Sequence, residues 1–154
     1  MSHPRAVAVL PRAVALVVWM AVHGCADVPG GAVELSWKLR AASGSSETFL
    51  ACEIGLPGTG NVEKIRLDWT VNGVASSHEW LCSDDHGATG FELPEGVALL
   101  RVSPLCATHD ATPETYTAPA PEERDVIAGN TISLGGVELL LEVSSCATQA
   151  CICQ

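Results

Sequence analysis

The strongest structural signal in the chain is an alternation of apolar and polar residues over 62–71, VEKIRLDWTV. Successive side chains of a β-strand point to opposite faces, so a period of two predicts a strand with one buried face. The apolar face would carry Ile65, Leu67, Trp69 and Val71. Asn72-Gly73 follows directly and favours the positive φ angles of a two-residue hairpin turn. We therefore predict a returning strand over 74–82.

Shorter segments with the same alternation recur along the chain, separated by turn residues. No segment after the N-terminal region has the period of an amphipathic helix. The further predicted strands are 32–40, 48–56, near 97–103, 125–134 and 137–144, with the last two forming a pair joined through Gly135-Gly136.

Two segments predict loops instead of strands. Residues 83–90, SDDHGATG, are polar and glycine-rich, and residues 107–124 are rich in proline, threonine and acids. The second segment predicts a long exposed loop, because proline cannot donate to a strand ladder and the composition is poorly apolar. About seven short strands at this spacing predict an all-β domain, an antiparallel immunoglobulin-like β-sandwich.

Three tryptophans, Trp37, Trp69 and Trp80, fall on predicted strand faces. We interpret them as core residues, because large aromatic side chains supply much of the buried area of a small sandwich. The alternative is an aromatic platform for binding sugars, which requires two of them to be exposed together.

The N-terminus has the pattern of a secretory signal peptide. Arg5 and Arg12 precede an uncharged apolar run at 13–22, which is too short to span a bilayer. Residues 22–25, Val-His-Gly-Cys, resemble the lipobox of bacterial lipoproteins, which implies that Cys25 is acylated and becomes the first residue. Ordinary cleavage after Ala26 is the alternative and would give a soluble secreted protein. The predicted divisions are a signal peptide at 1–24, an anchor and spacer at 25–31, and one domain at 32–154.

The lipobox resemblance also implies a destination. Ala26 is not the Asp that retains some lipoproteins at the inner membrane, so the resemblance implies outer-membrane attachment through the lipid. The formal net charge is −10, and loss of Arg5 and Arg12 with the signal would make it −12. Such a charge opposes nucleic-acid binding, which depends on neutralising phosphates with Lys and Arg. We expect a monomer whose acidic surface provides solubility.

Six cysteines remain beyond Cys25, an even number that predicts disulfides in an exported chain. We expect Cys52 to pair with Cys82, because both lie on apolar strand faces that can meet. A bond between Cys151 and Cys153 would close a very small ring with poor geometry. Cys106 is therefore expected to pair with Cys151 or Cys153, and Cys146 with the other. A thiolate metal site in the tail at 145–154 is the alternative, but its spacings are not those of structural zinc sites.

The order of these features resembles two groups of proteins. Phe91-Glu92-Leu93-Pro94-Glu95-Gly96 before a strand is similar to the strand entry of carboxypeptidase-regulatory-like sandwich modules. The mature chain as a whole resembles small cell-envelope lipoproteins of myxobacteria and their relatives, on Trp37, Cys52, 80–82, 94–96 and 126–134. The resemblance implies a sandwich and no activity. Unlike true immunoglobulin domains, the chain has no Tyr-x-Cys corner, so only the architecture is carried over.

The residues supply no recognisable catalytic or metal-binding set. His86 and His109 stand beside aspartates, but no ligand spacing supports a metal, and no Gly-x-Ser-x-Gly elbow is present. We predict no cofactor and no catalysis. The favoured function is a non-catalytic envelope lipoprotein that binds another envelope protein or a surface polymer. The alternatives are a carbohydrate-binding module, and a secreted hydrolase or inhibitor that uses 107–124 as an inserting loop.

Overall fold

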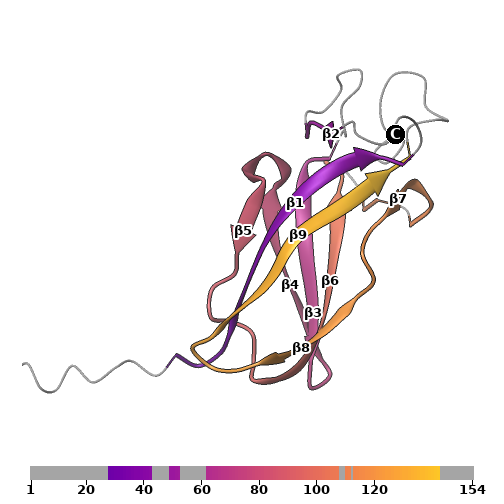
Figure 1. The fold of residues 1–154 in the computed structure, drawn as a ribbon. Helices are drawn as coiled ribbons and strands as arrows, with labels where there is room; N and C mark the ends of the chain where they lie inside the picture. Colours follow the sequence, from indigo (N-terminus) through magenta and orange to yellow (C-terminus); the bar gives the residue numbers. More distant parts are fainter. Residues whose placement is uncertain (1–27, 43–48, 53–61, 108–109, 112, 143–154) are drawn as a thin grey trace, which may run out of the picture.

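The structure is a computed structural model that describes residues 28–42, 49–52, 62–107, 110–111 and 113–142. These residues form two β-sheets that pack face to face as an all-β, sandwich-like fold (Figure 1). The helical elements in these ranges are two short 3-10 turns, η1 (Cys82–Asp84) and η2 (Pro113–Thr115). No helix in the same ranges is long and apolar enough to cross a membrane.

One sheet has four antiparallel strands in the order β4-β3-β6-β8. The predicted hairpin is confirmed as β3 and β4, with β3 inside the sheet and β4 at its edge. Asn72 and Gly73 have φ angles of 51° and 80°, which are the positive values that this turn requires. The strands are β3 (Lys64–Val71), β4 (Val74–Leu81), β6 (Gly96–Leu105) and β8 (Glu122–Val126).

The other sheet is built on the first and last long strands, β1 (Ala32–Ala41) and β9 (Thr131–Leu141). These two strands run parallel, with a shift of register between Glu34 and Ser36. The second edge of β1 is covered in turn by two short antiparallel strands, β5 (His86–Ala88) and β2 (Phe49–Leu50). A fifth strand, β7 (Tyr116–Thr117), pairs with the end of β9.

The β1–β9 pair corrects two predictions. The sandwich is not wholly antiparallel, and the expected hairpin joining 125–134 to 137–144 through Gly135-Gly136 is wrong. Gly135 has a φ of 65° and lies inside the single strand β9, where the pairing with β1 shifts register, so it forms an irregularity and not a turn. The chain between residues 122 and 126 instead joins the opposite sheet as β8.

Both predicted loops contain short strands. Residues 86–88 of the segment 83–90 pair with β1 as β5, and the segment 107–124 contains β7 and the start of β8. In 48–56 the described strand is only β2, and 53–56 lie outside the described residues. Strands of two or three residues form because a longer strand offers them a ladder, so their own sequences carry little signal.

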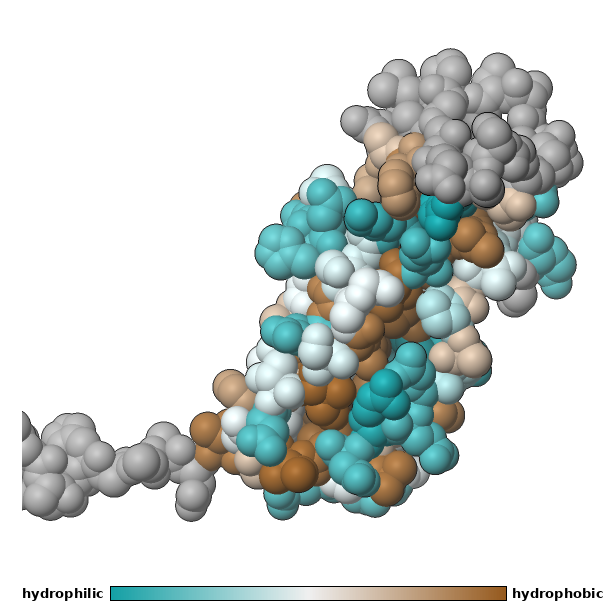
Figure 2. Space-filling model, in the orientation of Figure 1, coloured by the Kyte–Doolittle hydropathy of each residue, from teal (hydrophilic) through white to brown (hydrophobic). Residues whose placement is uncertain are grey.

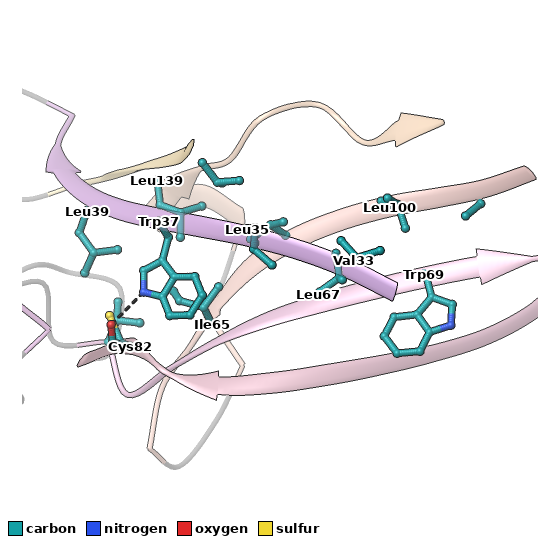
Figure 3. Packing of buried hydrophobic residues seen from close by; sticks show 14 of the residues in the cluster. Val33, Leu35, Trp37, Leu39, Ile65, Leu67, Trp69, Cys82, Leu100 and Leu139 are labelled. Atoms are coloured by element: carbon teal, nitrogen blue, oxygen red, sulfur yellow. Dashed lines mark hydrogen bonds between the residues drawn. The ribbon is translucent and has the colours of Figure 1, made fainter. Parts of the chain in front are cut away.

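The core lies between the sheets and is lined by the predicted alternating faces. Figure 3 shows Val33, Leu35, Trp37 and Leu39 of β1 lying along one edge of this layer, with Trp69 at its far end. Trp37 and Trp69 are 2% and 4% exposed, which confirms their role in the core. The members contributed by the four long central strands are Val33, Leu35, Trp37, Leu39, Ile65, Leu67, Trp69, Val71, Ala98, Leu100, Val102, Val137, Leu139 and Leu141.

The outer face of the β1–β9 sheet is mostly polar, with charged side chains from both strands. Figure 2 shows white and teal residues over this face, with brown apolar residues visible between them along the line of β1 and β9. Ser36 lies opposite Gly136 across the two strands, so little side-chain volume covers the backbone there. The alternation predicted for 32–40 is thus confirmed on both faces.

Two neighbouring leucines on β6 test the assignment of the core. Leu100 is 2% exposed, whereas Leu99 is 44% exposed on the outer face. We expect Leu100→Ala to lower the free energy of unfolding by about 2–5 kcal/mol, because it leaves a cavity between the sheets. Leu99→Ala should change it by less than about 1 kcal/mol. Urea unfolding followed by tryptophan fluorescence measures both, and equal effects would contradict the assignment.

Candidate functional site

One end of the sandwich is organised by the segment that carries the chain from one sheet to the other. β4 ends at Leu81, η1 follows, and β5 begins at His86 beside β1. Asp85 closes the turn with a left-handed φ of 61°, and its N–H donates to the carbonyl of Cys82 at 3.4 Å. Cys82 therefore lies in the turn and not on the strand face that was predicted for it.

The Trp37 side chain ties this crossover to β1. Its indole Nε1–H donates to the carbonyl oxygen of Cys82 at 2.8 Å, as drawn in Figure 3. Its backbone N–H donates to the carbonyl of Asp85 at 3.0 Å, and the N–H of Cys82 donates to the carbonyl of Glu63 at 2.8 Å. The indole N–H is thus satisfied inside the core, which is required for a buried tryptophan.

Trp80 fills the side of the sandwich between β4 and β5. Its ring is half-buried, lies 5.9 Å from the ring of Trp37, and packs on the backbone of Gly87. A methyl group added at Gly87 would come within 2.5 Å of the indole. The His78 ring lies 4.8 Å away and contacts Glu92 at 3.0 Å. With Trp37 and Trp69 buried, the pair of exposed tryptophans that a sugar platform requires is not formed.

A disulfide joins the two sheets at this end. Cys52 follows β2 of one sheet, Cys82 follows β4 of the other, and their Cα atoms lie 5.6 Å apart. The predicted Cys52–Cys82 pair is confirmed, although the bond spans the sheets and does not connect neighbouring strands. Cys106 is buried and also disulfide-bonded. The cysteine that is bonded to Cys106 lies outside the described residues. The cysteines outside them are Cys25, Cys146, Cys151 and Cys153.

A cleft of about 950 Å³ opens beside this disulfide. Among the described residues, its apolar part includes Leu39, Leu50 and Val62, while Glu63, Asp85 and His86 supply polar groups. Its volume is within the range of small-molecule or side-chain binding pockets. The cleft combines apolar contact with a few polar groups that could fix the orientation of a bound group.

An exposed aromatic side chain stands at the cleft between two cations. Phe49 is 53% exposed, with Lys38 Nζ at 4.8 Å and Arg40 Cζ at 5.5 Å from its ring centroid. Arg40 also forms a salt bridge with Glu138 at 3.0 Å. Each cation–π contact at an exposed site is worth about 0.5–1 kcal/mol, so the ring is held by its neighbours while remaining available for contact.

The serine hydroxyls and the histidine at the cleft are not hydrogen-bonded to one another in the described part of the chain. The Ser36 hydroxyl donates to the carbonyl of Gly135 at 3.3 Å, and within the described part of the chain no hydrogen bond joins His86 to Ser36 or Ser83. A nucleophile requires such a base within hydrogen-bond reach. The described residues also contain no group of three His, Cys, Asp or Glu side chains that could hold a metal ion. His109 lies outside them.

Sequence reasoning found the disulfide but not the cleft. Phe49 alternates with Leu50, so its outward direction could have been read from the predicted strand at 48–56. Nothing in the sequence indicates that His86 lies next to β1. Residues 86–88 do not have the composition of a strand, and they form one only through their pairing with β1.

Comparisons with protein-family models, with curated proteins and with solved structures find no match to this chain. The functional interpretation therefore rests on its own residues and their arrangement.

The disulfide should contribute strongly to stability. It closes a loop with a sequence separation of 30, and loop-closure entropy for that length corresponds to about 3–4 kcal/mol. We expect the oxidised Cys52→Ala/Cys82→Ala variant to lose about that free energy of unfolding in urea. The loss of stability on reduction is then measured for the variant and for the natural chain. The difference between the two losses is the contribution of the Cys52–Cys82 bond alone. An unchanged unfolding midpoint in the oxidised variant would contradict the prediction.

The contact between Trp80 and Gly87 gives a second test with a matched control. Gly87→Ala should lower the free energy of unfolding by about 1–3 kcal/mol, because the methyl group overlaps the indole. Gly90→Ala lies in the same connection, and nothing stands within 4 Å of its added methyl. The control should be neutral or slightly stabilising. Trp80 emission should shift in Gly87→Ala alone, and equal behaviour of the two variants would refute the packing.

Proposed function

We propose that the chain is a lipid-anchored, non-catalytic binding domain of the bacterial cell envelope, with an immunoglobulin-like sandwich carried by an acylated Cys25. Its ligand would be another envelope protein or a surface polymer, taken up at the cleft beside the Cys52–Cys82 bond. Two observations support the proposal: the export pattern at 1–24, and a cleft that combines apolar and polar groups.

The observation that carries this proposal is the position of the cleft relative to the start of the domain. The described chain begins at Val28, next to the end of the sandwich that contains Gly31, Leu93 and Ile127. β1 then runs the length of the sheet (Figure 1), and its residues 36–39 line the cleft. At about 3.3 Å per residue, this stretch lies about 13–23 Å along the strand from Ala32. A domain anchored at Cys25 would therefore present the cleft away from its membrane.

The composition supports the same arrangement. A net charge of −10 gives little attraction to anionic headgroups, so the domain would stand off the membrane on its lipid. The bridge between the sheets stabilises the end that would meet the ligand. The inhibitor alternative draws less support, because part of 107–124 is held in the sheets as β7 and the start of β8.

The test places a photo-crosslinking residue at Phe49 or at Ile127 in cells that export the protein. Both side chains are just over half exposed, but they lie at opposite ends of the sandwich. We expect one reproducible envelope component to be crosslinked from position 49 and not from position 127. The intact mass of the same material should show acylated Cys25.

The matched control is Cys25→Ala carrying the same crosslinker at position 49, which should leave the membrane fraction. Crosslinking to the same component from both positions would contradict a role for the cleft. A chain that begins after Ala26 and carries no lipid would contradict the anchor, and would leave a soluble secreted binding protein.

A further inference from the structure

The strand β4 forms an edge that lacks the usual protection against strand addition. Among the described residues β4 pairs only with β3, in an unbroken register from Val74 opposite Val71 to Leu81 opposite Lys64. Its sequence, VASSHEWL, contains no proline, no lysine and no bulge, which are the devices that protect most edge strands. Val74 and Leu81 at its two ends are 62% and 53% exposed.

The geometry of the hairpin identifies the backbone groups at this edge. The residues that flank a two-residue turn exchange both hydrogen bonds, and such pairs alternate along antiparallel strands. Val74, Ser76, His78 and Trp80 therefore face β3 with their backbone N–H and C=O groups. The groups that point away from β3 belong to Ala75, Ser77, Glu79 and Leu81.

Two other sheet edges carry features that oppose strand addition. β8 ends the same sheet on its opposite side and is nearly all charged, with Glu122, Glu123, Arg124 and Asp125. β9 is interrupted at Gly135, where the register shifts, and its end is paired with β7. β4 is therefore a long, regular edge of the described sandwich, and its one acidic residue, Glu79, is paired with Lys64 on the neighbouring strand.

We propose that the free edge of β4 binds an extended, basic segment of another polypeptide, which adds to the sheet as a strand beside β4. Asp84 and Asp85 are exposed in the turn that follows β4, and neither forms an ion pair in the described structure. Glu79, by contrast, is paired with Lys64 at 3.1 Å. Backbone hydrogen bonds would supply affinity and the two aspartates would select a basic residue at one end of the segment.

Charge decides between a partner and a second copy of the chain. Two copies would each carry a net charge of −10 or below, which opposes their association, whereas a basic segment is attracted. This inference goes beyond the proposed function, because the edge of β4 requires neither Phe49 nor the lipid at Cys25 and shares only Asp85 with the cleft.

The probe is a labelled peptide of about ten residues that alternates threonine and valine, with a lysine at each end so that either strand direction brings one lysine to Asp84 and Asp85. Fluorescence anisotropy with the oxidised, exported chain measures its binding. We expect Ser77→Pro to weaken binding roughly tenfold or more, because it removes an edge N–H without touching the ladder to β3. The matched control Ser77→Ala should bind as the natural chain does.

Two further variations keep the result independent of misfolding in Ser77→Pro. The same peptide with alternate backbone nitrogens methylated should not bind the natural chain, because it cannot donate to the edge. Asp84→Asn/Asp85→Asn should weaken binding and reduce its dependence on salt. Equal binding of the methylated peptide, or of a peptide with glutamate in place of lysine, would overturn the proposal. A concentration-dependent dimer abolished by Ser77→Pro would also overturn it, in favour of a second copy.

Discussion

The parallel pairing of β1 with β9 is the constraint on which the rest of the sandwich depends. Parallel strands cannot be joined by a tight turn, so the chain between residues 41 and 131 must return to the starting end of the sheet before β9 begins. That intervening chain builds the second sheet, and its short returns supply β2, β5 and β7 to the edges of the first. The fold therefore rests on contacts between residues about a hundred positions apart, which carry a large loop-closure entropy.

The end of the sandwich at η1 shows how this arrangement produces a site. The chain changes sheets there, and a crossover leaves backbone groups that need partners. The indole of Trp37 and the backbone of Glu63 satisfy Cys82, while the Cys52–Cys82 bond holds β2 against the turn. Cleft and disulfide thus occupy the same end because both result from one change of sheet. The chain enters the domain at the opposite end, where β1 begins. The two ends of the domain along β1 are therefore different.

The two surfaces with binding character differ in physical kind. The cleft at Phe49 offers side-chain contacts in a hollow, and could recognise a compact group. The edge of β4 offers backbone hydrogen bonds, and suits an extended chain. Asp85 belongs to both surfaces, because it lines the cleft and also closes the turn that follows β4. Ligands at the two surfaces would therefore share a residue whose position is fixed by that turn.

The sequence by itself determined the local features: the all-β character, the faces of β1 and β3, the Asn72-Gly73 turn, the burial of Trp37 and Trp69, and the Cys52–Cys82 pair. The first four follow from the two-residue period or from backbone preference. The Cys52–Cys82 pair follows from the small number of cysteines available, although Cys82 lies in η1 and not on the predicted strand face. The tertiary structure alone decided that β9 is one strand with an irregularity at Gly135, that 86–88 joins β1, and that Phe49 stands at a cleft. These features depend on which distant strand supplies hydrogen-bond partners, and a linear pattern of apolar residues does not specify that choice.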